Sequence, residues 1–317
     1  MINLTLDEIK ILLNTKTAKE IFKGNKDEIF RYLAYRTHPD NKKDDGSLFR
    51  LLNKKFEELT AKKTTITSKK RSYTIEGIFA EGDICTIFQT DNMLLKIGRS
   101  PKTKLDNERN LLKALSDNTE ELAKLRYYYD VLLDSFTLPD GRSCDVFAEN
   151  PHKITLENIK NKYQKGLPWN HCAWIFKRIL AAIHYCHSCN HVHSAILPSH
   201  ILVNPQDHGC MVIGLNHSYK IGEKCKTISP KYEALYAPEI LKKESQDAST
   251  DIYMATQTLR WLLGDQILEE KRLKIFLDGL TLTRVSARMS SALEVHWALD
   301  EILRKVFGPP KFHKLEV

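Results

Sequence analysis

The side chains of this chain that could do chemistry gather between residues 186 and 203. Cys186-x-x-Cys189 is followed by His191 and His193, and thiolates and imidazoles are the ligands that zinc prefers in proteins. Four ligands within eight residues, however, leave little chain to wrap around a tetrahedral ion. We therefore expect that this segment holds no metal.

The second half of the segment, HSAILPSHILV, has a proline five residues after His193 and ends in a short apolar run. This outline resembles the catalytic loop of protein kinases, H-R-D-L-K-P-E-N, in which the Asp accepts the proton of the substrate hydroxyl and the Asn binds magnesium. The chain has Ala195 at the Asp position and His200 at the Asn position. Because alanine has no lone pair to accept a proton, the resemblance implies that the frame of the loop is kept and its chemistry is lost.

Alternating apolar residues from Tyr73 to Gly98 predict short strands, and LDNERNLLKAL predicts an amphipathic helix after them. This order resembles the small lobe of a protein kinase. The resemblance puts Lys96 in the place of the strand lysine that contacts the nucleotide phosphates, and Glu108 in the place of the helix glutamate that pairs with it. Gly82 matches one of the three glycines of the family's Gly-rich loop. Two interpretations stay open: Lys96 and Glu108 contact a nucleotide, or they only tie the strand to the helix.

Three later positions match motifs of the kinase large lobe. Tyr236-Ala237-Pro238-Glu239 reproduces A-P-E, whose glutamate pairs with a buried arginine in the family, and Arg284 is the candidate partner. Asp251 matches the aspartate that opens the central helix of the large lobe and steadies the backbone of the catalytic loop. In CMVIGLNHS, Gly214 stands where the family has the magnesium-binding Asp of D-F-G.

The motifs that build the large lobe are thus kept, whereas Ala195, His200 and Gly214 replace those that transfer phosphate. The resemblance therefore implies a pseudokinase, which is not an enzyme and requires no cofactor. Residual nucleotide binding would then be of ATP without magnesium, through Lys96 and Gly82. The alternative is an atypical ATP-dependent phosphotransferase or nucleotidyl transferase on the same fold.

Two amphipathic helices are predicted near the start of the chain, from DEIFRYLAYR (27–36) and LFRLLNKKFEEL (48–59). His38-Pro39-Asp40 and a polar loop separate them, and the proline ends the first helix because it restricts the residue before it. A helical hairpin with H-P-D in its connection resembles a J-domain, the module by which co-chaperones stimulate a DnaK-type ATPase chaperone. The resemblance implies that His38, Pro39 and Asp40, together with the basic Arg31 and Arg36, bind that chaperone.

The net charge of +8 is concentrated in the first part of the chain. Residues 1–72 contain 13 Lys and 4 Arg against 10 acidic residues, a net charge of +7, so the remainder carries only +1. A basic domain suggests an acidic protein surface or nucleic acid as its partner. Aromatic residues that could stack on bases are missing beside the lysines, which argues against nucleic acid.

The composition is that of an ordinary globular protein, 42% hydrophobic and 28% charged. No apolar run approaches the ~18 residues of a membrane span, and Asp7 and Glu8 stand where a secretory signal would be basic and then apolar. The seven cysteines are scattered, so we expect them to be reduced. The sequence therefore predicts a cytoplasmic protein without a membrane segment.

Taken together, the sequence predicts an α+β protein of two domains. A J-domain-like helical hairpin (1–62) and a basic linker (63–72) precede a bilobal kinase-like fold, with a small β-rich lobe (73–149), a large helical lobe (150–309) and a tail (310–317). The expected function is that of a non-catalytic co-chaperone. Its J-domain recruits and stimulates a DnaK-type ATPase chaperone, and its pseudokinase domain binds a client or partner protein whose identity the sequence does not give.

Overall fold

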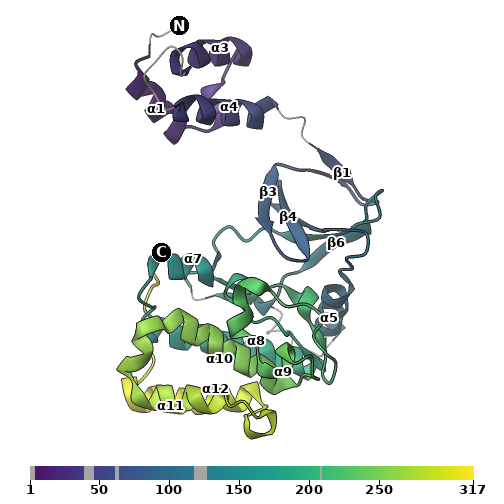
Figure 1. Ribbon diagram of the computed structural model, residues 1–317, viewed down its shortest axis with the longest axis vertical. Helices are drawn as coiled ribbons and strands as arrows, with labels where there is room; N and C mark the ends of the chain where they lie inside the picture. Colours follow the sequence, from purple (N-terminus) through teal and green to yellow (C-terminus); the bar gives the residue numbers. More distant parts are fainter. Residues whose placement is uncertain (1–3, 39–45, 61–63, 118–126, 208) are drawn as a thin grey trace. The chain divides into compact units, whose positions relative to one another are not determined.

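The chain forms two compact units, Met1–Thr65 and Ile66–Val317. The structure, a computed structural model, describes residues 4–38, 46–60, 64–117, 127–207 and 209–317, with the backbone alone for 57–60 and 269. The first unit is helical, and the second has a β-sheet lobe and a helical lobe (Figure 1). No helix in the described ranges is both long and apolar enough to cross a membrane.

The first unit contains four helices, α1 (Leu6–Thr15), α2 (Ala18–Ile21), α3 (Lys26–Thr37) and α4 (Ser47–Thr60). Thr5 and Thr17 each begin a helix with a capping box, in which the threonine and a glutamate three residues later satisfy each other's backbone N–H groups. The helices share one apolar core, formed by Ile9, Leu13, Ile21, Phe22, Leu33 and Leu52. Helices α3 and α4 coincide with the two amphipathic helices predicted over residues 27–36 and 48–59.

Helices α3 and α4 run antiparallel. Phe30, near the start of α3, stacks on Phe56, near the end of α4, with 4.0 Å between ring centroids. At the opposite end, His38 caps α3 in an extended conformation and its ring lies 4.9 Å from that of Phe49. Helices are thus present at the two predicted places and lie antiparallel. Pro39 and Asp40 lie outside the described residues.

The β-sheet lobe of the second unit is a five-stranded antiparallel sheet in the order β3-β4-β5-β7-β6. Its strands are β3 (Gly77–Glu81), β4 (Cys85–Thr90), β5 (Met93–Gly98), β6 (Leu132–Thr137) and β7 (Ser143–Ala148). Helix α5 (Asp106–Asp117) follows β5. Leu95, Ile97 and Val146 form the buried centre of the lobe, because alternate residues of β5 and β7 face the same side of the sheet.

Residues that the sequence analysis assigned to a linker are ordered as a hairpin of β1 (Thr65–Thr67) and β2 (Ser72–Thr74). The side chain of Asp134 on β6 accepts hydrogen bonds from Ser68 Oγ at 2.6 Å and from the Tyr73 hydroxyl at 2.7 Å. Lys70 Nζ lies 3.4 Å from the same carboxylate. The segment predicted to be a linker thus contains a β-hairpin, because Asp134, far away in the sequence, binds its polar side chains.

The helical lobe is built around α8, which packs against α10 and α12 (Figure 1). Its helices are α7 (Leu156–Lys162), α8 (Trp169–Ser188), α9 (Pro238–Leu241), α10 (Ala248–Leu263), α11 (Lys271–Leu280) and α12 (Ala292–Phe307). Its 3-10 turns are η3 (Pro198–His200), η4 (Leu215–His217), η5 (Pro230–Leu235), η6 (Gly264–Glu269) and η7 (Val285–Ala287). Short strands lie between the helices: β8 (Ile154–Thr155), β9 (His191–Val192), β10 (Ile201–Val203), β11 (Cys210–Val212) and β12 (Tyr219–Lys220). All seven cysteines are free thiols.

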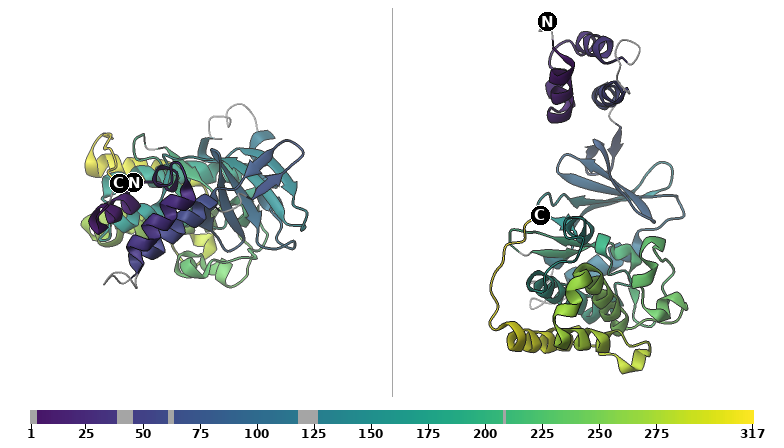
Figure 2. Two further views of the ribbon diagram at one scale, coloured as in Figure 1. Left: turned by 90° about the horizontal axis from the view of Figure 1, so that it is seen from above. Right: turned by 60° about the vertical axis from the view of Figure 1, so that its left-hand side comes forward.

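The C-terminal tail runs back from α12 across the helical lobe to α7 (Figure 2). Leu315 is 1% exposed and belongs to the same apolar core as α8 and α10. Its N–H donates to the carbonyl of Pro205 at 3.3 Å, and the hydroxyl of Tyr163, the C-cap of α7, donates to the carbonyl of Glu316 at 2.8 Å. The tail is therefore part of the packed lobe.

Replacing Leu315 by alanine should destabilise the helical lobe, because it leaves a cavity where a buried side chain was. We expect the free energy of unfolding to fall by about 2–5 kcal/mol, the usual range for a buried leucine. Val317→Ala is the control, since Val317 is 49% exposed. Urea denaturation of both variants measures the difference, and equal stabilities would show that the tail is not docked.

Candidate functional site

An ion pair joins strand β5 of the β-sheet lobe to helix α5. Lys96 Nζ lies 2.7 and 2.8 Å from the two carboxylate oxygens of Glu108, and both side chains are buried. Burial by itself would lower the pKa of Lys96, but the Glu108 carboxylate outweighs it and the pKa is raised. Lys96 therefore stays charged in the folded chain.

A second ion pair and a buried amide surround this pair, and the sequence analysis missed both. Arg109 of α5 donates through Nε to the Asp145 carboxylate at 2.8 Å. Asp145 lies on β7 directly opposite Lys96 on β5 in the register of the sheet. The backbone carbonyl of Asn216, in the turn after Gly214, accepts a hydrogen bond from the side-chain amide of Asn107 at 3.2 Å. These contacts fix α5, and with it Glu108, against β7 and the turn that contains Asn216. The partners are far apart in the sequence, so only the fold shows that they meet.

Gly82 lies in the tight turn between β3 and β4. Its N–H donates to the carbonyl of Cys85 at 2.9 Å, and its own carbonyl accepts from Nε of Arg99 at 2.8 Å. In a phosphate-binding loop the backbone N–H groups face the ligand. The N–H of Gly82 is instead engaged within the turn, so the nucleotide contact predicted for Gly82 would require this turn to open.

The predicted catalytic-loop segment is held by Asp251, at the start of α10. This fully buried carboxylate accepts from the backbone N–H of His193 at 2.7 Å and of Ser194 at 2.8 Å. Nε2 of His187 lies 3.0 Å from the same carboxylate. Ser194 has φ of +61°, a conformation that costs a residue with a side chain some strain. The contact between Asp251 and the loop is the one that the kinase resemblance implied.

Three histidines gather where this loop meets the turn after β11. The ring centroid of His200 lies 6.3 Å from that of His193 and 5.4 Å from that of His217. Burial is the main cause that lowers the pKa of all three histidines, to about 4 for His200 and to about 2 for His217. Positive charge on nearby groups, such as Lys96, lowers these pKa values further. All three are therefore neutral near pH 7. Among the described residues, no group of three or more His, Cys, Asp or Glu side chains is arranged to hold a metal ion.

His200 and Gly214 fit one another sterically. Gly214 has φ of +82°, and a Cβ at this position would lie only 2.8 Å from ring atoms of His200. Nδ1 of His200 lies 2.9 Å from the carbonyl of Ala195, which fixes the ring in place. An aspartate at position 214 would therefore displace His200. Magnesium prefers several oxygen ligands, and these two positions, which hold them in the kinase family, do not offer such a set here.

The predicted partner of Glu239 was wrong. Arg284 is exposed and donates to Ser286, whereas Arg288 makes two hydrogen bonds to the Glu239 carboxylate, at 2.7 and 3.0 Å. Arg288 also donates to two backbone carbonyls, and its guanidinium lies 4.7 Å from the ring centroid of Tyr253. The pKa of Glu239 is lowered, because its hydrogen bonds, first that from Arg288, outweigh the effect of burial. Local sequence gives no reason to prefer Arg288 to Arg284.

Known proteins resemble this chain in structure and not in sequence. No family model matches the chain, and no curated protein matches it in sequence. The structure is similar to that of vaccinia related kinase 3, with a TM-score of 0.61, 11% sequence identity, and coverage of 78% of this chain and 92% of that one. The chain therefore has a protein-kinase-like fold, with a β-sheet lobe and a helical lobe.

This similarity overturns one prediction. The sequence analysis inferred that the chain is not an enzyme, whereas the matched fold is that of a protein kinase, a family of enzymes. The inference rested on Ala195, His200 and Gly214, and unusual residues at three positions do not remove the buried ion pair of Lys96 and Glu108. We therefore withdraw it.

The Glu239–Arg288 pair should be a main support of the helical lobe. Removing either partner leaves a buried charge uncompensated, which typically costs about 3–5 kcal/mol. We expect this loss for Glu239→Gln and for Arg288→Ala, and a smaller loss for the double variant than for the two singles added. Arg284→Ala is the matched control and should be nearly silent in thermal unfolding.

The contribution of Glu239 should also depend on pH. Because its pKa is lowered in the folded chain, the stabilisation is complete above the pKa of the unfolded state and is lost as pH falls through the folded-state pKa. If Arg284→Ala proves as damaging as Arg288→Ala, or if the single losses simply add, the pairing is incorrect.

Proposed function

We propose that the first unit acts as a J-domain that recruits and stimulates a DnaK-type ATPase chaperone, while the kinase-fold unit binds the client or partner protein. The observation that carries this proposal is the antiparallel pair α3 and α4 with the H-P-D motif in their connection. His38 ends α3 in an extended conformation, which places the motif outside the helix. A cytoplasmic location would fit this proposal and is not required for its test.

The basic side chains of α3 divide into two kinds. Arg31 is exposed and available to an acidic partner, whereas Arg36 is partly buried and donates to the carbonyl of Leu4 at 2.6 Å. Arg36 therefore helps to hold the chain before α1 as well as adding positive charge. A charge reversal at Arg31 tests partner binding more cleanly than one at Arg36, because only the latter also breaks a contact of the fold.

His38→Gln should abolish stimulation of the chaperone ATPase while leaving the helices intact. We expect wild-type protein to raise the rate of ATP hydrolysis by a purified DnaK-type chaperone, and Lys19→Gln, an exposed change on α2, to do the same. Circular dichroism checks that both variants keep their helices. Stimulation by His38→Gln at the wild-type level would exclude the J-domain function.

The Lys96–Glu108 pair favours a second function, nucleotide-dependent phosphoryl or nucleotidyl transfer by the kinase-fold unit. Lys96 is charged and lies where the kinase fold places its phosphate-contacting lysine. His200 is neutral, and if its Nδ1–H donates to Ala195, its Nε2 keeps a lone pair that could accept the proton of a substrate hydroxyl. Magnesium does not fit the residues at positions 200 and 214, so we expect ATP to bind without it there.

A thermal-shift titration with ATP, with magnesium and with a chelator, tests the nucleotide site. Lys96→Ala should remove the shift, but it also leaves Glu108 buried without a partner, so the double variant Lys96→Met/Glu108→Gln provides a second test. Lys104→Ala, an exposed change nearby, should keep the shift. Label transfer from ATP that disappears in the Lys96 variants would show catalysis. A shift that persists in both Lys96 variants would refute nucleotide binding at this site and leave the chaperone proposal standing.

A further inference from the structure

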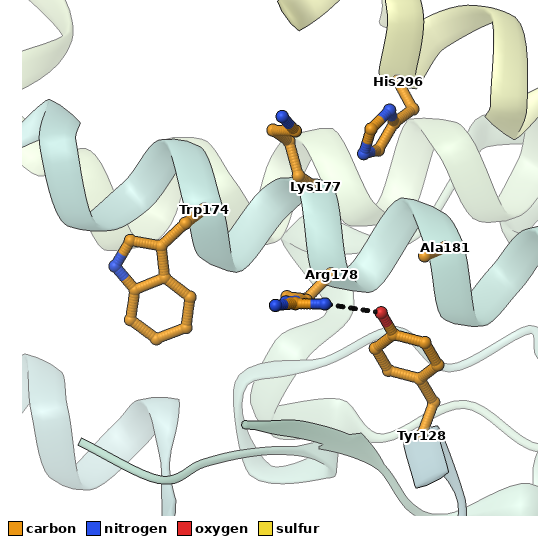
Figure 3. Close-up of a pocket in the computed structure, with 6 residues that line it drawn as sticks. All are labelled: Tyr128, Trp174, Lys177, Arg178, Ala181 and His296. Atoms are coloured by element: carbon orange, nitrogen blue, oxygen red, sulfur yellow. Dashed lines mark hydrogen bonds between the residues drawn. The ribbon is translucent and has the colours of Figure 1, made fainter. Parts of the chain in front are cut away.

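A hollow of about 280 Å³ lies between α8, α12 and the segment before β6 (Figure 3). We call it the α8–α12 pocket. Trp174 and Tyr128 stand on either side of Arg178 in this view, while Lys177 and His296 approach from the two helices. The residues that line the pocket are Tyr128, Trp174, Lys177, Arg178, Ala181 and His296.

The pocket carries positive charge that its own walls do not neutralise. Three of its lining residues are basic and none of them is acidic. Arg178 is exposed and donates to the neutral hydroxyl of Tyr128 at 3.0 Å, so this contact does not offset its charge. Lys177 pairs with Asp300, but Asp300 also accepts from Arg304, so two cations share one carboxylate. An anion entering the pocket would meet an excess of cationic groups.

His296 supplies a polar atom without a partner. Its Nδ1 is buried and makes no hydrogen bond with any residue in the described part of the chain. Burial lowers the pKa of His296, and Lys177 and Arg178 lower it further against the opposing effect of Asp300. Because this nitrogen has no accessible surface, His296 lines the pocket through the other atoms of its ring.

We propose that the α8–α12 pocket binds a phosphate monoester carried on an aromatic ring. The faces of Trp174 and Tyr128 suit a flat ring, and the planar guanidinium of Arg178, with Lys177 and His296, suits a doubly charged phosphate. The volume of about 280 Å³ lies just below the ~300–1,000 Å³ of typical ligand pockets, which fits one ring and one phosphate better than a whole nucleotide. The ligand is either a phosphotyrosine side chain of a protein or a free aromatic phosphate.

Isothermal titration of the full chain with phenyl phosphate tests the proposal. We expect saturable binding that Arg178→Gln weakens about tenfold or more, because a charge-assisted hydrogen bond is lost. Ala181→Leu should abolish binding by filling the pocket without changing its charge, and leucine is well tolerated in a helix. Arg272→Gln, an exposed change on α11, is the control and should bind as wild type does. Melting temperatures confirm that each variant is folded.

Titrations with other phosphate compounds distinguish the two sources of the ligand and test the role of the aromatic walls. Tighter binding of a phosphotyrosyl peptide than of phenyl phosphate supports a protein ligand, and the reverse order supports a free aromatic phosphate. Inorganic phosphate or a phosphoseryl peptide that binds as well as phenyl phosphate would overturn the proposal, because the aromatic walls would then contribute nothing. Unchanged binding by Ala181→Leu, or no saturable binding by wild type, would overturn it equally. None of these results bears on the chaperone or nucleotide functions.

Discussion

The carboxylate of Asp251 is the contact on which the kinase-fold unit most depends. It lies in the first turn of α10, where the positive end of the helix dipole favours a negative charge. Its oxygens accept hydrogen bonds from the backbone of His193 and Ser194, and Nε2 of His187 in α8 lies at hydrogen-bond distance. These bonds also hold Ser194 in its strained left-handed conformation. The shape of the loop is therefore imposed by α10 and does not depend on the identity of the side chain at position 195.

The same turn of α10 reaches a second buried carboxylate. The hydroxyl of Thr250, next to Asp251, donates to Glu239 at 2.7 Å, and Glu239 is bound by Arg288. A buried charge is tolerated only when it is paired and its remaining oxygens are hydrogen-bonded, and Glu239 meets both conditions. Two adjacent residues of one helix thus connect the catalytic-loop segment, α9 and the turn before α12. Ala195 takes no part in this network, so the fold does not depend on the side chain at that position.

The parts of this structure that could be predicted from the sequence follow from local patterns. Lys96 and Glu108 were found because a strand and an amphipathic helix, each recognisable alone, place them in a known order. Arg284 and Arg288 lie in one polar turn, and only packing against Tyr253 and Glu239, far away in sequence, selects Arg288. Leu315 is a similar case, because the tail has no periodicity and its docking depends on the core formed by distant helices.

The distribution of charge decides where an acidic partner can be attracted. Around Lys96 the charges are already paired, because Lys96 forms an ion pair with Glu108 and Arg109 forms one with Asp145. Burial keeps the clustered histidines neutral. A triphosphate needs its charge offset by metal ions or cationic side chains, so it could use Lys96 only by competing with an existing ion pair. The first unit, residues 1–65, in contrast carries a net charge of +4, from 11 Lys and 3 Arg against 10 acidic residues, and Arg178 in the α8–α12 pocket faces a neutral hydroxyl. Long-range attraction should therefore arise at the first unit and at this pocket, and nucleotide binding beside Lys96 should depend on shape and on exchange of hydrogen bonds.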